Sequence, residues 1–260
     1  MSNKTDRIEK ILFALKKHGA VSIKDLSKSL KVAEMTIRRD LQQISTLNPV
    51  KVLHGGAIYI SADKTVPDSE KVYSYEEECI KNKEAKNRIG QKAASLVVPQ
   101  DTIIIDPGTT TEYLAKHIPE DFPLTVLAYS LNIMNIVCRR VNFDQIMAGG
   151  IFHRNTLSFV GPTGIELIRQ IRASKVFISA SGISEKLGVT STNLYEIEIK
   201  KAAINSSKTK VLLADSSKFN QVKIAHFADL QDFDIIITDT GIPEYYLTII
   251  KELGVTLHCV

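Results

Sequence analysis

Residues 34–45, EMTIRRDLQQIS, decide how the amino-terminal part of the chain folds. Ile37, Leu41 and Ile44 recur at the spacing of one helix face, so the stretch predicts a helix with this stripe turned inward. Successive helical residues turn by about 100°, which places Arg39 nearly opposite the stripe. The outward face therefore carries Met35, Thr36, Arg38, Arg39, Gln42 and Gln43.

Two more helices are predicted before this one. Ser22 and Asp25 have the spacing of a helix N-cap and its partner, and they open a short second helix. Only residues 31–33 separate that helix from the third, and so short a turn makes the two cross steeply, as in a helix-turn-helix. The first helix ends near Gly19 and is indicated by an apolar stripe at Ile8, Ile11, Leu12 and Leu15.

The positive charge of the chain is concentrated in this amino-terminal part, which we call the head. Residues 1–60 hold 11 basic and five acidic side chains, a balance of +6, whereas residues 61–260 hold 22 basic and 24 acidic ones, a balance of −2. A basic head on a near-neutral body indicates a polyanionic partner. Arginine makes bidentate hydrogen bonds to guanine edges or binds phosphates, and glutamine and threonine contact base edges or the DNA backbone. The alternative is a solubilising terminus with a solvated helix face.

Residues 48–57, NPVKVLHGGA, follow the third helix. Asn-Pro ends that helix, residues 50–53 have the composition of a short strand, and Gly55-Gly56 permits a tight turn. The strand would form a wing along the DNA backbone, with Lys51 and His54 near phosphate. The predicted DNA contacts are then Thr36, Arg38, Arg39, Gln42, Gln43, Lys51 and His54.

Residues 59–78 show no sustained period and are rich in Ser, Asp, Glu and Lys, so we predict a linker there. Its tyrosines, Tyr59, Tyr73 and Tyr75, are expected to dock on the body. A helix from about Ile80 to Leu96 follows. The predicted organisation is a head at 1–58, a linker at 59–78 and an effector-sensing and oligomerisation domain at 79–260.

The body alternates short apolar runs with turns and helical periods. Strands this apolar are buried on both faces, as in a parallel sheet covered by helices. The pattern predicts a Rossmann-like, doubly wound α/β domain of about 180 residues. The predicted strands are Thr102–Ile105, Leu124–Ala128, Gln145–Ala148, Lys175–Ser179, Lys210–Ala214 and Asp234–Thr238.

In such folds ligands bind beyond the carboxyl ends of the strands. After the first strand comes DPGTTT (106–111), where Gly108 frees the backbone and a helix begins directly behind three threonines. Exposed N–H groups and the helix dipole suit a phosphate. The alternative is that each turn is only a turn or an N-cap. The candidates at this edge are Asp106, Gly108, Thr109, Thr110, Thr111, Ser130, Asn132, Gly149, Gly150, Ser181, Gly182, Asp215 and Lys218.

Lys200 lies four residues after Glu196 in a predicted helix, and two interpretations stay open. The pair is the right distance apart for an ion pair on the helix surface, with a contribution of a few tenths of a kcal/mol. Alternatively, Lys200 reaches into the phosphate site.

Several of these stretches together resemble the DeoR family of bacterial transcription regulators. In the head the resemblance rests on TIRRDL (36–41), the upstream IEKIL and HGAVSIKDLSKSLKV, and HGGA (54–57). In the body it rests on DPGTTT, AGG (148–150), a Gly182, Ile183, Gly188 and Thr190 pattern, and LLADSSKF (212–219). The resemblance adds Thr190 to the effector candidates. It implies a winged helix-turn-helix, and a sensor domain related in fold to ribose-5-phosphate isomerase that binds phosphorylated sugars.

The chain departs from the family pattern at a few positions. Ala33 stands where Ser or Thr usually caps the recognition helix, a loss of about 1 kcal/mol. The wing region has Asn48-Pro49 where a Gly-containing turn is usual, and Lys51 where Arg is common. In the sensor, Tyr129 is expected to reshape the pocket, and Pro107 removes one N–H donor.

The resemblance implies a repressor of a carbohydrate uptake or catabolism operon, controlled by a phosphorylated sugar or polyol. One head makes too few base contacts for selective binding, so a dimer or tetramer is expected. A sugar-phosphate isomerase is the alternative, but it needs a carboxylate base, and residues 179–182 read SASG. A third possibility is unspecific DNA binding. A rim filled by side chains or lined with acids would argue against the sensor.

Composition excludes other classes. With 44% hydrophobic and 24% charged residues the chain is neither disordered nor a coiled coil. No apolar run approaches the roughly 20 residues of a membrane helix, so we expect a cytoplasmic protein without a membrane partner. Cys79, Cys138 and Cys259 are too scattered for a zinc site, and we expect neither a metal nor a cofactor.

Overall fold

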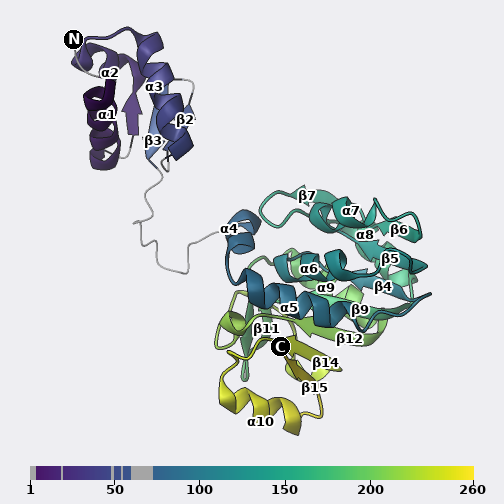
Figure 1. Cartoon of the computed structure of the whole chain (residues 1–260). Helices are drawn as coiled ribbons and strands as arrows, with labels where there is room; N and C mark the ends of the chain where they lie inside the picture. The colour runs from purple at the N-terminus through teal and green to yellow at the C-terminus, as the bar shows by residue number, and fades with distance from the viewer. Residues whose placement is uncertain (1–3, 19, 48–49, 54, 60–72) are drawn as a thin grey trace. The chain divides into compact units, whose positions relative to one another are not determined.

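The computed structural model describes residues 4–18, 20–47, 50–53, 55–59 and 73–260. They belong to two compact units, Met1–Lys71 and Val72–Val260, and each unit is described by itself (Figure 1). Within the described ranges, no helix has both the length and the apolar character needed to cross a membrane.

The first unit is a helix-turn-helix with a small sheet. Its core is built from fully buried Ile11, Leu15, Ile37 and Leu41, which confirms the stripes predicted from the sequence. The predicted N-cap is also present, because the Ser22 hydroxyl accepts a 3.4 Å hydrogen bond from the Asp25 N–H. The elements are α1 (Lys4–His18), β1 (Ala20–Ser22), α2 (Ile23–Leu30), α3 (Glu34–Leu47), β2 (Val50–Leu53) and β3 (Gly56–Tyr59).

The predicted wing strand, β2, pairs antiparallel with β3, and β3 pairs with β1. Tyr59 ends β3, so it belongs to the head and not to the predicted linker. Lys51 lies on β2, and its side chain is outside the described part. Asn48, Pro49 and His54 also fall outside the described residues.

An ion pair connects α3 to α1. Asp40 is 3% exposed and lies 2.6 Å from Nε and 3.3 Å from Nη2 of Arg7. Asp40 therefore holds α3 against α1, while the side chain of its neighbour Arg39 is exposed. Ala33 directly precedes α3, and its carbonyl accepts from the N–H groups of Thr36 and Ile37.

A glycine is required at position 56 because the backbone of Val21 lies very close to it. A Cβ on Gly56 would lie 2.2 Å from the Val21 carbonyl oxygen, whereas one on Gly55 would meet nothing within 4 Å. Gly56→Ala should therefore lower the free energy of unfolding of the head by about 1–3 kcal/mol, and Gly55→Ala should leave it nearly unchanged. Thermal unfolding followed by circular dichroism measures both; equal midpoints would contradict the strand packing.

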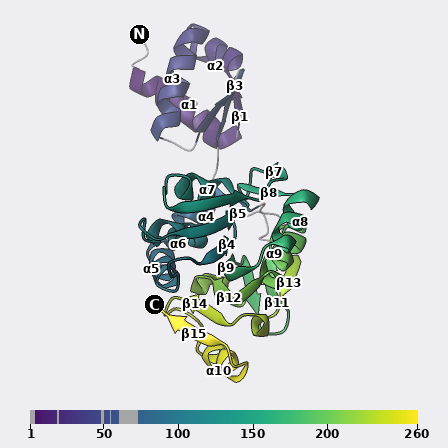
Figure 2. The ribbon, with the colours of Figure 1, turned by 90° about the vertical axis from the view of Figure 1, so that its right-hand side faces the viewer.

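The second unit is built on a parallel sheet with the order β15-β14-β12-β9-β4-β5-β6 in the described chain. In chain order, β5 and β6 follow β4 on one side, and the later strands β9, β12, β14 and β15 then add on its other side, as in a Rossmann fold (Figure 2). Each of the six predicted strands is present, four of them with ends shifted by one to three residues, and β15 was not predicted. The strands are β4 (Thr102–Ile105), β5 (Leu124–Ala128), β6 (Phe143–Met147), β9 (Ala173–Ser179), β12 (Ser207–Leu213), β14 (Ile235–Thr238) and β15 (Thr256–Cys259).

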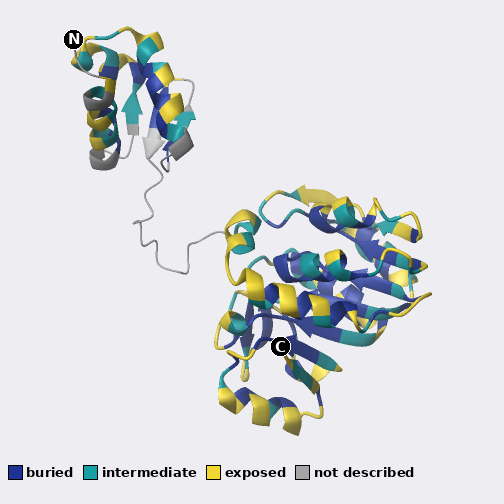
Figure 3. Ribbon diagram, in the orientation of Figure 1, coloured by how far each residue is buried: buried dark blue, intermediate teal, exposed yellow. Residues whose placement is uncertain are grey.

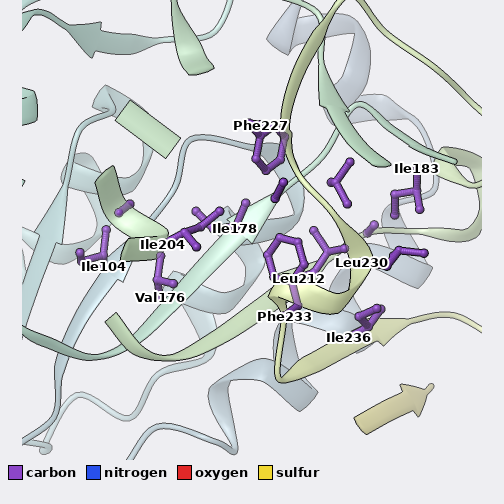
Figure 4. Packing of buried hydrophobic residues seen from close by; sticks show 14 of the residues in the cluster. Ile104, Val176, Ile178, Ile183, Ile204, Leu212, Phe227, Leu230, Phe233 and Ile236 are labelled. Carbon is purple, nitrogen blue, oxygen red and sulfur yellow. The ribbon is translucent and has the colours of Figure 1, made fainter. Parts of the chain in front are cut away.

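Helices cover both faces of this sheet, so the doubly wound prediction is confirmed. Along β4, Ile103 and Ile105 join the cluster under α5, α6 and α7, while Ile104 joins the opposite cluster under α8, α9 and α10. Figure 3 shows the strands of the sheet largely in the dark blue of buried residues, whereas the helices carry yellow, exposed residues. Figure 4 shows part of the second cluster. The helices are α5 (Lys83–Ala94), α6 (Thr109–His117), α7 (Leu131–Val137), α8 (Pro162–Gln170), α9 (Glu196–Asn205) and α10 (Glu244–Glu252).

Several smaller elements were not predicted. The hairpin of β7 (Ile151–His153) and β8 (Ser158–Val160) and the antiparallel β10-β11-β13 sheet are two of them. The strands of this small sheet are β10 (Gly182–Ser184), β11 (Gly188–Ser191) and β13 (Ala225–Ala228). The remaining unpredicted elements are α4 (Tyr75–Ile80) and the 3₁₀ turns η1 (Ser216–Lys218) and η2 (Leu230–Asp232).

The predicted linker of 59–78 is wrong at both ends, because its last residues are part of the second unit. Residues 75–78 lie in α4, and the Tyr75 N–H donates a 2.9 Å hydrogen bond to the Asn155 carbonyl. The helix predicted from Ile80 to Leu96 corresponds to α5, which is shorter at both ends, and Asn82 directly before α5 lies in the left-handed region at φ 50°.

Candidate functional site

The central strands β4 and β9 mark the point where the strand order reverses. In open α/β sheets the crevice for ligands lies beyond the carboxyl ends of the strands at this point. Asp106 follows β4 directly, and Ser179 is the last residue of β9. The two strands therefore bring side chains 73 positions apart in sequence into hydrogen-bond contact, at 2.7 Å between Ser179 Oγ and Asp106 Oδ2.

Asp106 is fully buried and surrounded by partners. Its Oδ2 lies 2.5 Å from Lys200 Nζ and accepts a 2.9 Å hydrogen bond from the Ser179 N–H. Its Oδ1 accepts a 2.5 Å hydrogen bond from the Tyr129 hydroxyl. Burial, followed by the nearby Asp106 charge, raises the pKa of Tyr129 well above its ordinary value, so this hydroxyl stays a donor. Asp106 thus ties together β4, β5, β9 and α9.

This network settles the interpretation of Lys200. The surface ion pair with Glu196 is wrong: Lys200 is 2% exposed, and its ammonium reaches Asp106 and the Ser179 carbonyl. Glu196 instead accepts hydrogen bonds from the Ser191 hydroxyl and the Asn193 amide. Tyr129, expected to shape the pocket, is buried behind it as a support for Asp106.

A small pocket lies beside this network. Of the predicted effector residues, the structure brings together Gly108, Thr109, Thr110, Ser181, Lys200 and Lys218 in its lining. Residues that the sequence argument did not select complete it: Tyr73, Glu78, Pro107, Thr156, Ser179, Ala180, Ser191, Thr192 and Glu196.

The amino terminus of α6 faces this pocket. The first N–H groups of a helix have no partner within it, and α6 has no side-chain cap at Gly108. Gly108 is needed for close approach, since a Cβ there would lie 2.6 Å from Ser179 Oγ. Thr109 and Thr110 add hydroxyl groups at the same turn. Such a turn is a suitable site for an anion.

The lining also contains two acids, and an acid-lined rim was expected to argue against a sensor. The carboxylates of Glu78 and Glu196 lie in the described lining together with the ammonium groups of Lys200 and Lys218. Lys218 Nζ lies 2.7 Å from Glu78 Oε2. Burial alone would raise the pKa of Glu78, but hydrogen bonds from Lys218 and Lys81 outweigh it and lower this pKa to about 2. Glu78 is therefore ionised at neutral pH.

The other predicted effector residues lie outside this lining and have structural contacts. The Thr111 hydroxyl donates to the Asp106 carbonyl, and Asn132 Nδ2 to the Gly108 carbonyl. Asp215 caps η1, and Gly149 and Gly150 lead into β7. Thr190 donates to the Gly182 carbonyl in the small sheet. Outside the lining are thus Asp106, Thr111, Ser130, Asn132, Gly149, Gly150, Gly182, Thr190 and Asp215.

The outward face of α3 is the candidate nucleic-acid surface. Arg39, Gln42 and Gln43 are exposed, and Thr36 and Arg38 are half-buried beside them. The inward Ile37 and Leu41 are fully buried, so the orientation predicted for the helix is confirmed.

Both units match models of one family. Residues 7–63 match the DeoR-like helix-turn-helix domain, and residues 81–240 match the DeoR C terminal sensor domain. The chain belongs to the DeoR family. It is 33% identical to the deoxyribose operon repressor of Escherichia coli over 92% of this chain and 91% of that protein. It is 32% identical to the lactose phosphotransferase system repressor of Staphylococcus epidermidis, over 92% and 93% respectively.

Solved structures resemble the DeoR sensor unit more distantly. Ribose 5-phosphate isomerase A from Methanocaldococcus jannaschii aligns with a TM-score of 0.40 and 13% identity, over 53% of this chain and 55% of that one. eIF2B beta from Chaetomium thermophilum aligns with a TM-score of 0.43 and 16% identity, over 59% and 48%.

Family membership confirms the prediction of a regulator over that of an isomerase. The argument from a missing carboxylate was wrong in its premise, because Glu78 and Glu196 line the pocket from other parts of the chain. Each is hydrogen-bonded to neighbouring side chains of the protein. No group of three or more metal-ligating side chains occurs in the part of the chain that is described.

The buried pair gives a stability prediction. Lys200→Met leaves the Asp106 carboxylate buried without its cation, so it should lower the free energy of unfolding by about 3–5 kcal/mol. Arg169→Met is the control, because its ion pairs with Glu166 and Glu198 are exposed and should contribute at most about 0.5 kcal/mol. Urea unfolding of the sensor unit measures both. Similar midpoints for the two variants would contradict the central role of the pair.

Proposed function

We propose that the chain represses an operon for carbohydrate uptake or catabolism, and that a phosphorylated sugar or polyol bound in the sensor unit controls its affinity for operator DNA. The protein acts as a dimer or tetramer, because two or more heads are needed for selective binding. The ligand changes DNA affinity only to the extent that it binds one arrangement of the oligomer better than another.

One observation carries the effector proposal: the uncapped amino-terminal turn of α6 lines a pocket at the topological switch point, beside Lys218. Backbone N–H groups, threonine hydroxyls and an ammonium form the donor set that a phosphate requires. The hydroxyls of Ser181, Ser191 and Thr192 line the same pocket and suit the hydroxyl groups of a sugar. The names of the two repressors that act on sugar operons support the same ligand class.

The DNA proposal rests on α3. Its polar face is exposed, its apolar face is fixed in the core, and Asp40 is tied to Arg7 of α1. A helix held in this way presents Arg39 to the major groove at little entropic cost.

Arg39→Ala should weaken binding to a DNA duplex selected by the protein from a random pool by about 10-fold or more, since a bidentate contact to a base contributes about 1–3 kcal/mol. Fluorescence anisotropy measures the affinity. Arg139→Ala, an exposed arginine of the sensor unit, is the control and should bind as the unaltered protein does. Unchanged affinity of the Arg39 variant would count against α3 as the recognition helix.

Replacing Thr109 and Thr110 together by Ala should weaken the binding of ribose 5-phosphate, used as a probe, by about 10-fold, because two hydroxyl donors leave the anion site. Isothermal titration calorimetry on the full chain measures this. Thr248→Ala on α10 is the exposed control. If the double variant binds the probe as tightly as the control does, the phosphate site lies elsewhere.

A further inference from the structure

Lys218 of the anion site is already paired with a carboxylate of the chain. Glu78 lies 140 positions earlier in sequence, yet its Oε2 is 2.7 Å from Lys218 Nζ, and both side chains line the pocket. The side chains are 15% and 18% exposed, so the pair is largely withdrawn from solvent. The Glu78 carboxylate therefore neutralises the cation that a ligand phosphate would need.

The segment that carries Glu78 is held on the sensor unit by a small number of polar contacts. Lys86 Nζ donates a 2.6 Å hydrogen bond to the Glu78 carbonyl, and burial lowers the pKa of Lys86. The Tyr75 hydroxyl donates to Glu112 of α6. Tyr73 lines the pocket. Thus the predicted docking of Tyr73 and Tyr75 on the body is confirmed, and the docked segment reaches the anion site.

Within α4 itself, burial adds little to these polar contacts. None of the six residues of α4 is buried, and Ile80 is 70% exposed. A segment without a buried apolar face has little to hold it once its polar anchors are lost. Its attachment therefore depends on a few polar contacts, one of which is the ion pair between Glu78 and Lys218.

We propose that Glu78 is an internal competitor for the anion site: a ligand phosphate takes its place on Lys218 and thereby releases residues 73–80 from the sensor. A phosphate dianion carries more charge than a carboxylate and also accepts from the amino-terminal N–H groups of α6. The inference rests on the proposed function for the identity of the ligand. It adds the release of residues 73–80 as the event that follows binding. This segment is the first described part of the chain after the head in sequence.

The competition explains why a site for an anion contains acids. With Glu78 in place, Lys218 already has an anionic partner within the protein. With a phosphate in place, the carboxylate leaves and the cation keeps a partner. Binding and release of the segment are then two parts of one exchange. The apparent affinity for the ligand is reduced by the fraction of molecules in which Glu78 is bound.

Glu78→Gln tests this on the full chain, with Glu77→Gln as the matched control on the exposed side of α4. Without ligand, amide hydrogen exchange of residues 73–80 should be about 10-fold faster in Glu78→Gln than in the control, because the ion pair to Lys218 is lost. Calorimetric titration should show tighter binding of ribose 5-phosphate and of inorganic phosphate, by about fivefold or more. In the unaltered protein, saturating ribose 5-phosphate should speed the exchange of 73–80 and slow that of 108–112.

Each contrary result has a distinct meaning. Equal phosphate affinity in Glu78→Gln and Glu77→Gln overturns the competition while leaving the anion site intact. Binding that slows exchange in 73–80 also overturns it, since the segment would then close over the ligand. If neither variant binds either probe, the proposed effector function fails together with the competition, even where the segment is loosened by Glu78→Gln.

Discussion

The buried ion pair between Asp106 and Lys200 is the contact on which the sensor depends. Two opposite charges, 2.5 Å apart and almost without exposure, keep their stability only as a pair, because either one alone in the interior is costly. Asp106 also binds Ser179 and Tyr129, so the ends of β4 and β9 stay together with α9. The switch point of the sheet is thus fixed in position, and the turn at Gly108 and the start of α6 lie against it.

Because Lys200 is paired with Asp106, Lys218 is the lysine of the described pocket lining that remains to bind an anionic ligand. Its present partner comes from α4, a short segment with no buried side chain. The fixed start of α6 and the weakly held α4 therefore both lie beside the ammonium group of Lys218. This arrangement suits a sensor, since binding at a fixed site changes the attachment of a neighbouring segment. An entirely preformed cradle would bind the ligand and transmit nothing.

Much of this was predictable from sequence. Buried parallel strands such as β4 appear as unbroken apolar runs, and α3 appears as a stripe of Ile37, Leu41 and Ile44, so the fold class and the helix-turn-helix follow from local pattern. The interaction partners of charged residues cannot be predicted from local pattern. Glu78 and Lys218 are 140 positions apart and Asp106 and Lys200 are 94 apart, and no local period records such pairs. Pattern alone therefore left two interpretations of Lys200 open, and it assigned residues 75–78 of α4 to the linker.

Soaking crystals of the full chain in selenate, a tetrahedral dianion with a strong anomalous signal, tests directly whether the start of α6 and Lys218 form one anion site. We expect an anomalous peak within hydrogen-bond distance of Lys218 Nζ and the N–H groups of Thr109 and Thr110, with the Glu78 carboxylate turned away. A peak elsewhere on the sensor, with Glu78 still bound to Lys218, would contradict such a site.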